Sequence, residues 1–115
     1  MTRQKRRVRD SNIVINVYET TSPRRLTAPP GSEFFPSLEN GDFFLNAIGP
    51  SSSDVDCQFQ VWIFEMKDGQ GSWKPLAWGD LVNGRHVVIT KKGNDISLIA
   101  PTTFQKRYKE ARIVV

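Results

Sequence analysis

The residue types that most often carry catalysis are scarce in this chain of 115 residues. Cys57 is the only thiol and His86 the only imidazole, so a base-activated cysteine nucleophile would need this one pair within hydrogen-bond reach. Cys57 alternates onto the same face as Phe59 and Val61, where a small apolar side chain is expected. His86 lies in a predicted strand and is interpreted as a surface residue. The sequence contains no Gly-x-Ser-x-Gly motif and no phosphate-binding glycine loop. We therefore expect a protein that is not an enzyme.

Two short acidic stretches are the candidates for metal ligands, Asp54-Val55-Asp56 and residues 68–71. Calcium takes six to eight oxygen ligands, and neither stretch supplies such a series or a bidentate glutamate at the required spacing. Zinc would need more Cys and His than the chain contains. Both stretches are interpreted as turns in which Asp accepts backbone N–H bonds. We expect no metal and no cofactor.

Three tryptophans, Trp62, Trp73 and Trp78, lie on the two arms of one predicted hairpin. Trp62 and Trp73 are expected to face one another across the strands, as cross-strand aromatic pairs do. One interpretation is that the indoles are bulky core side chains. The other is an exposed platform that stacks on sugars or nucleobases.

Positive charge is concentrated at the start of the chain, which carries a net charge of +4. Residues 1–10 hold five of the 16 Lys and Arg residues and one of the 12 Asp and Glu residues, which leaves eleven of each sign for residues 11–115. Nucleic-acid-binding domains usually have a basic face on the folded body, and residues 11–115 have no surplus to make one, although local clusters remain open. The basic residues of the first segment are Arg3, Lys5, Arg6, Arg7 and Arg9.

These cations predict an extended arm over residues 1–10 that binds acidic surfaces of neighbouring protein subunits. Two alternatives stay open for the same segment. The first is a disordered, solubilising end of the chain, and the second is a grip on nucleic acid through phosphate contacts.

The elements that would position these residues are predicted to be strands. Alternating or β-branched apolar residues predict strands over 12–18, 42–48, 57–66, 73–78, 85–90, 96–100 and 108–115. Asn83-Gly84 predicts a type I′ hairpin turn, and residues 67–72 predict a hairpin loop longer than two residues. Residues 105–112 also favour a short helix, against the strand-forming Ile113-Val114-Val115. Turns about every ten residues predict a single antiparallel β-sandwich, jelly-roll or Ig-like, of seven to eight short strands over residues 11–115.

Residues 20–41 interrupt this pattern with a long, proline-rich segment. Its four prolines remove backbone donors and favour extended geometry before them. We interpret it as a crossover between two sheets, with Phe34 and Phe35 plugging one end of the core. The alternative is a partner-binding loop. In that case Phe34 and Phe35, with Trp73 and Trp78, are the candidate interface residues.

The expected location follows from what the sequence lacks. The longest apolar run has four residues, from Val61 to Phe64, far below the roughly 18 that a membrane helix needs. The charged start differs from a secretory signal, and a single cysteine cannot form an internal disulfide. We expect synthesis in the cytoplasm, a virion as a later location, and no membrane partner.

The stretch from Phe59 to Ala100 combines a strand ending in Trp-x-Phe, a Gly-rich hairpin followed by Trp73, an Asn-Gly turn and a short closing strand. It resembles one half of the small β-sandwiches found among accessory virion proteins of tailed phages. The resemblance implies a non-catalytic role, in which the protein decorates or cements a capsid or tail through repeated subunit contacts, as a homo-oligomer. It carries over no functional residues. A nucleic-acid-binding β-domain that uses the arm is the second hypothesis, and a carbohydrate-binding sandwich is the third.

Overall fold

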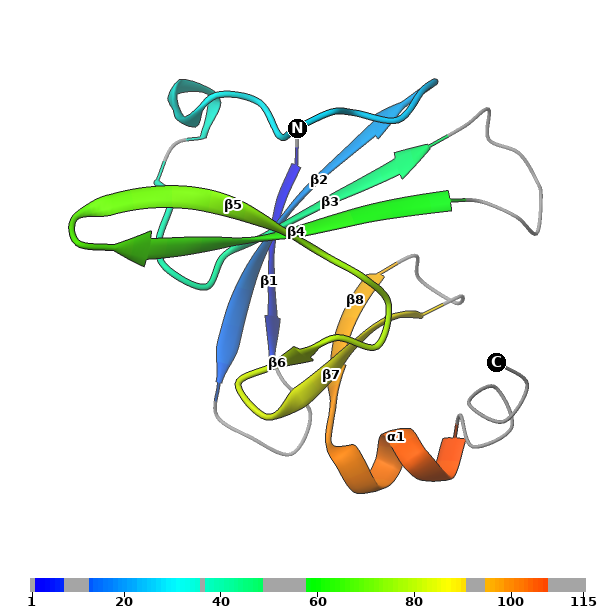
Figure 1. Ribbon diagram of the computed structural model, residues 1–115. Helices are drawn as coiled ribbons and strands as arrows, with labels where there is room; N and C mark the ends of the chain where they lie inside the picture. Colours follow the sequence, from blue (N-terminus) through cyan, green and yellow to red (C-terminus); the bar gives the residue numbers. More distant parts are fainter. Residues whose placement is uncertain (1, 8–12, 36, 49–57, 91–94, 108–115) are drawn as a thin grey trace. The chain divides into compact units, whose positions relative to one another are not determined.

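A computed structural model of the chain describes residues 2–7, 13–35, 37–48, 58–90 and 95–107. These residues form eight strands, one short α-helix and one 3-10 turn, which confirms the predicted all-β class (Figure 1). The chain divides into two compact units. The first contains β1 to β5, and the second contains β6 to β8 and the helix α1.

The first unit is a five-stranded sheet in the order β1-β2-β3-β4-β5. Its strands are β1 (Thr2–Arg7), β2 (Val14–Ser22), β3 (Phe43–Ile48), β4 (Gln58–Lys67) and β5 (Gln70–Leu76). Every neighbouring pair is antiparallel except β2 and β3, which are parallel. The prediction of a purely antiparallel fold is therefore wrong at this pair.

The proline-rich segment explains the parallel pair. Parallel neighbours need a crossover of a dozen residues or more, and residues 23–42 connect the end of β2 to the start of β3. The prediction that residues 20–41 cross between two sheets is wrong, because the segment joins two neighbours in one sheet. Among its described residues, the regular element is the 3-10 turn η1 (Ser32–Phe34).

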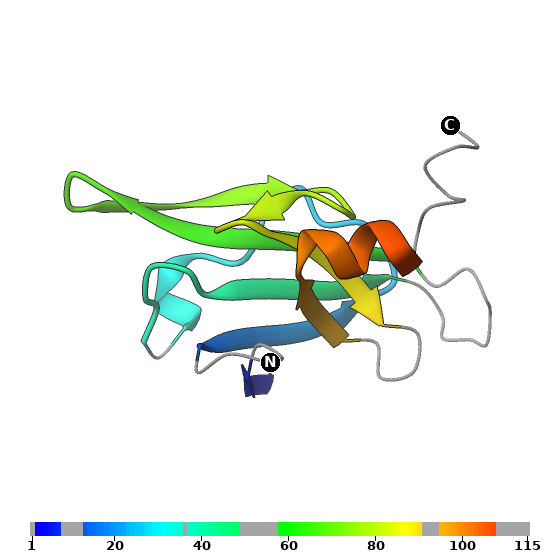
Figure 2. The same cartoon turned by 90° about the horizontal axis from the view of Figure 1, so that it is seen from below.

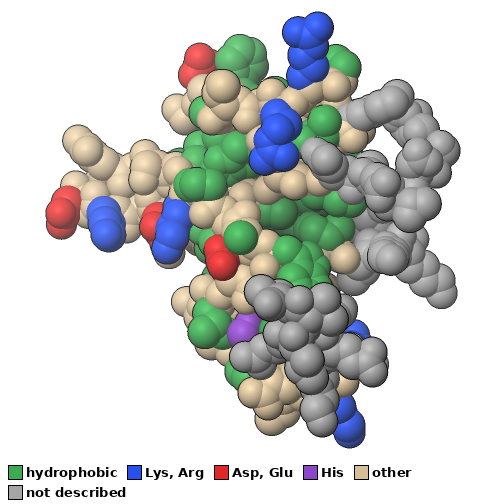
Figure 3. Space-filling model, turned by 45° about the vertical axis from the view of Figure 1, so that its right-hand side comes forward, with side chains coloured by type: hydrophobic (Ala, Val, Ile, Leu, Met, Phe, Trp, Pro, Cys, Tyr) green, Lys and Arg blue, Asp and Glu red, His purple; other side chains and the backbone are tan. Residues whose placement is uncertain are grey.

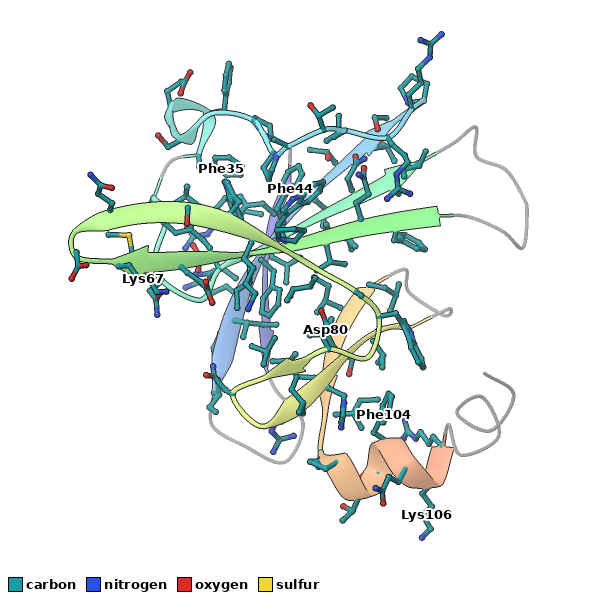
Figure 4. The ribbon with its side chains drawn as sticks, viewed as in Figure 1. Phe35, Phe44, Lys67, Asp80, Phe104 and Lys106 are labelled. Carbon is teal, nitrogen blue, oxygen red and sulfur yellow. The ribbon has the colours of Figure 1, made fainter. Side chains whose placement is uncertain are left out.

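Both faces of the five-stranded sheet carry apolar side chains. The register places Tyr18, Phe44 and Trp62 on one face and Val17, Phe43 and Ile63 on the other. The crossover covers the first face, where Phe35 packs with Tyr18, Phe44 and Trp62 in one buried cluster. Leu26, Leu38 and Trp73 pack against this cluster. We call the cluster and these three side chains the aromatic cluster (Figure 4).

A buried amide network holds the start of the crossover on the same face. The Nδ2 of Asn46 donates to Gln60 Oε1 at 3.0 Å and to Ser22 Oγ at 2.9 Å, and its Oδ1 accepts from Thr20 Oγ1 at 2.8 Å. Gln60 then binds both backbone groups of Leu26, donating to its oxygen and accepting from its N–H. Polar groups that leave water must be paired, and these five residues pair one another.

Two hairpins use two-residue turns. Asn83 and Gly84 have φ values of 51° and 81°, which confirms the predicted type I′ turn between β6 (Leu81–Val82) and β7 (Arg85–Thr90). Asp68 and Gly69 have φ values of 52° and 80°, with Lys67 opposite Gln70. The longer loop predicted over residues 67–72 is therefore wrong, since Asp tolerates positive φ well enough to close a tight turn.

The second unit is a three-stranded antiparallel sheet in the order β6-β7-β8, with β8 at Asp95–Ile99. The helix α1 (Pro101–Arg107) follows β8 after one residue, and its Phe104 packs against Val88 and Ile99. The helix thus begins before the residues 105–112 considered for it, at a proline whose fixed φ suits a first helical position. The predicted strand over 108–115 lies outside the described residues.

Within the part of the chain that the structure describes, no helix has the length and apolar character to cross a membrane.

Candidate functional site

The basic residues at the start of the chain lie in an edge strand. β1 pairs with β2 from Thr2 opposite Glu19 to Arg7 opposite Val14, and no other described strand pairs with its outer side. The structure thus places residues 2–7 in the sheet, where the sequence predicted an arm separate from the body (Figures 1 and 2). Strand pairing uses backbone groups that any residue but proline supplies. Residues 8–10, with Arg9, lie outside the described residues.

Two side chains of β1 are exposed and cationic. The Arg3 guanidinium lies 5.8 Å from the centre of the Tyr18 ring, within range of a cation–π contact. Lys5 is also exposed, opposite Asn16. Within the described ranges, neither Arg3 nor Lys5 forms an ion pair. Arg6 and Arg7 occupy the last two positions of the strand. We call residues 2–7 the β1 edge.

Tyr18 connects the β1 edge to the aromatic cluster. Burial raises the pKa of its hydroxyl above the ordinary value, and the nearby Arg3 charge opposes that rise. The hydroxyl donates to the backbone oxygen of Ser37 at 3.2 Å, and the ring meets Phe35 edge-on at 4.9 Å. The phenol therefore stays neutral at physiological pH and helps to position the crossover.

The four predicted interface aromatics have different environments. Phe35 and Trp73 both belong to the aromatic cluster, where Phe35 is 6% exposed and Trp73 is half-buried. These two side chains stabilise the core, so the structure does not offer them to a partner. Phe34 is 64% exposed and Trp78 is 49% exposed. The sequence alone could not predict which of Phe34 and Phe35 is buried, because an irregular loop has no regular alternation of buried and exposed residues.

The three tryptophans have different surroundings. Trp62 lies opposite Pro75, two residues along β5 from Trp73. The predicted cross-strand pair of Trp62 and Trp73 is therefore wrong. Trp73 lies opposite Phe64, with ring centres 5.0 Å apart. Trp78 belongs to the second unit, where its ring is 5.5 Å from that of Phe104.

A second exposed feature of the first unit is the turn η1. Glu33 and Phe34 both lie in it, and both are exposed. The turn therefore presents a carboxylate beside an apolar ring. We call Glu33 and Phe34 the η1 turn. By contrast, the tip of the β4–β5 hairpin mixes both signs, with Lys67 next to Asp68 (Figure 3).

His86 is the one residue considered for catalysis that lies within the described ranges. His86 lies in β7, as predicted, and is half-buried. Its ring stacks on that of Phe104, with the ring centres 4.0 Å apart and an angle of 15° between the ring planes. Its Nδ1 lies 2.8 Å from the backbone oxygen of Gly79. Cys57 and the Asp54–Asp56 stretch lie outside the described residues. Among those described, no three His, Cys, Asp or Glu side chains form a group that could hold a metal ion.

No protein-family model, curated protein or solved structure matches this chain.

Proposed function

We propose that this chain is a non-enzymatic assembly protein, whose copies bind one another and neighbouring subunits through the β1 edge. The observation that carries the proposal is a strand with four cations in six residues, TRQKRR, at the edge of a sheet. An edge strand has a row of backbone N–H and C=O groups available for another chain. Addition of a partner strand to such an edge is a recurring mode of protein recognition. The cations select an acidic partner.

The η1 turn of a second copy has the complementary chemistry. Its Glu33 carboxylate would pair with Arg3 or Lys5, and its exposed Phe34 ring would supply apolar area to the interface. Because the two surfaces differ, the contact is heterologous, and repeated contacts of this kind build rings or filaments. Residues 59–100 resemble part of the accessory virion proteins of tailed phages, so we propose that this assembly takes place in a virion.

Removing the charges of the β1 edge tests this function. The variant R3Q/K5Q/R6Q/R7Q keeps a polar strand but loses its cations. We expect the dissociation constant for self-association to rise at least tenfold, because charge-assisted hydrogen bonds contribute about 1.5–3 kcal/mol each. Sedimentation velocity over a range of protein concentrations measures this constant. Raising the ionic strength from about 0.1 to 1 M should also weaken the wild-type assembly, since the Debye length falls from about 10 to 3 Å.

The matched control is R24Q/R25Q, which removes two exposed cations from the crossover and leaves β1 intact. This variant should self-associate like the wild type. Equal weakening by both variants would show that net charge alone matters and would reject a specific role for the β1 edge.

Nucleic-acid binding is the second candidate function, because the same four cations could contact phosphates. It predicts affinity for duplex DNA that falls with salt, with a slope of about −0.9 for each phosphate contacted. DNA binding by a wild-type protein that stays monomeric would favour this candidate over assembly. A carbohydrate site has less support, because Trp62 is buried and Trp73 is half-buried against other aromatic rings, which leaves Trp78 as the exposed tryptophan among the described residues.

We also propose that the two units form one β-sandwich. The register supports this, because the face of β7 and β8 opposite α1 carries Val87, Ile89, Ile96 and Leu98. The face of the first sheet away from the crossover is equally apolar, with Val17, Phe43, Leu45 and Ile63. Two apolar faces in one chain favour packing against each other.

Cooperative unfolding tests the sandwich. Ile96→Ala should cost about 3 kcal/mol, and in a sandwich this loss lowers the stability of both units together. Trp73 fluorescence reports on the first unit and Trp78 on the second, each in a background where the other two tryptophans are phenylalanine. Equal shifts of the two urea midpoints are expected. A shift confined to Trp78 would show that the units fold independently.

A further inference from the structure

A pocket of about 320 Å³ lies in the second unit, where β8 meets the helix α1. The described lining residues include two arginines, Arg85 and Arg107, and two residues with hydroxyl side chains, Ser97 and Thr103. Leu98, Ile99 and Ala100 complete the described lining, which contains no carboxylate. The pocket thus combines two positive charges with a hydroxyl-bearing and apolar wall.

The fold brings these residues together from three elements. Arg85 is the first residue of β7, directly after the tight Asn83-Gly84 turn, so a rigid hairpin holds its backbone. Only Ala100 separates β8 from α1, so the helix starts beside the strand. Thr103 and Arg107 are four residues apart in α1 and therefore share one face of the helix.

The helix is fixed in place by its apolar side. Phe104 packs against Val88 and Ile99 and stacks on His86, whereas Lys106 points away from the sheet (Figure 4). The arginine at position 107 is therefore carried by a helix that is docked on its own sheet. This docking positions the pocket before any ligand arrives.

Among the residues whose side chains the structure describes, no carboxylate forms an ion pair with the guanidinium of Arg85 or Arg107. Two like charges beside one cavity repel each other, and an anion in the cavity would relieve that repulsion. The pocket therefore favours an anionic occupant.

We infer that this pocket binds a small phosphomonoester. Such a group carries a charge of about −1.5 to −2 at neutral pH and three acceptor oxygens, which matches two guanidinium groups. A carboxylate has a single charge and would leave one arginine unbalanced. Guanidinium groups bind phosphate through paired N–H bonds, and hydroxyls can add further donors. The apolar wall then contacts the organic part of the ester, and a volume near the low end of ligand pockets limits its size.

Titration with O-phosphoserine, followed by the backbone amide resonances of Ser97 and Thr103, tests the inference. Serine, inorganic phosphate and acetate are titrated in parallel. We expect saturable shifts with O-phosphoserine, with a dissociation constant of about 1 mM or lower, and about tenfold weaker binding of acetate. Inorganic phosphate should bind in the same pocket, and serine should not. Shifts that stay linear to the highest concentration, or acetate binding as tight as phosphoserine, would overturn the inference.

Two single variants assign the binding to the arginines. Arg85→Gln and Arg107→Gln should each weaken O-phosphoserine binding at least about tenfold. Lys106→Gln is the matched control, since it removes one positive charge from the same helix outside the pocket. Equal weakening by K106Q would reduce the effect to general electrostatics and reject the pocket. The R3Q/K5Q/R6Q/R7Q variant should bind O-phosphoserine like the wild type, so this inference can fail independently of the assembly function.

Discussion

Phe35→Ala is expected to lower the free energy of unfolding by about 3–5 kcal/mol, whereas Phe34→Ala should change it by less than about 0.5 kcal/mol. The two residues are neighbours of the same type, but only Phe35 lies inside the aromatic cluster. The centre of its ring lies 4.9 Å from that of Tyr18, 5.9 Å from that of Phe44 and 5.4 Å from that of Trp73. Truncation would leave a cavity in a packed core. Urea denaturation of both variants measures the difference.

The same pair of variants separates stability from assembly. Phe34→Ala should fold normally but weaken self-association, because the exposed ring belongs to the η1 turn. Phe35→Ala should reduce assembly only as far as it reduces the folded fraction. Similar stabilities for the two variants would contradict the placement of Phe35 in the core.

Asn46→Ala is expected to cost about 3 kcal/mol, although the residue is polar and sits in a strand. Asn46 is 0% exposed and makes three side-chain hydrogen bonds, so its loss removes one bond each from Gln60, Ser22 and Thr20. Each hydrogen bond contributes about 1 kcal/mol to stability, so the loss of three bonds accounts for the expected cost. Because Gln60 holds both backbone groups of Leu26, the start of the crossover should also open more readily.

Asn40→Ala is the control, since Asn40 is exposed and its Oδ1 accepts one bond, from the Met66 N–H at 2.9 Å. It should cost about 1 kcal/mol or less. Hydrogen exchange of the Leu26 amide provides a local readout and should accelerate in Asn46→Ala alone. Unchanged exchange at Leu26 would show that the amide network does not hold the crossover.

Much of the fold follows from the sequence pattern because strands and tight turns have local signals. Alternation located β3, β4 and β7 closely, and Asn83-Gly84 defined its turn through positive φ angles. Strand direction has no such signal. Alternation reports which side chains are buried, and it reads the same in parallel and antiparallel pairs, so the β2–β3 pair required the structure.

The site was harder to predict for physical reasons. The β1 edge has no apolar alternation, because its pairing with β2 depends on backbone groups while its side chains stay polar. The contrast between Phe34 and Phe35 arises in a loop without a regular period. The two arginines, Arg85 and Arg107, are far apart in sequence, and both line the pocket because α1 docks on the sheet.

The most direct test of assembly through the β1 edge is a mixing experiment followed by native mass spectrometry. One variant, R3Q/K5Q/R6Q/R7Q, lacks the basic surface, and the other, E33Q/F34A, lacks the acidic and aromatic one. A heterologous contact predicts that the wild type forms larger multimers and that each variant alone is monomeric. An equimolar mixture should form a one-to-one dimer that grows no further, because only one intact contact remains. A wild-type chain that stays monomeric at all concentrations, or a mixture that forms no dimer, would contradict the proposed assembly.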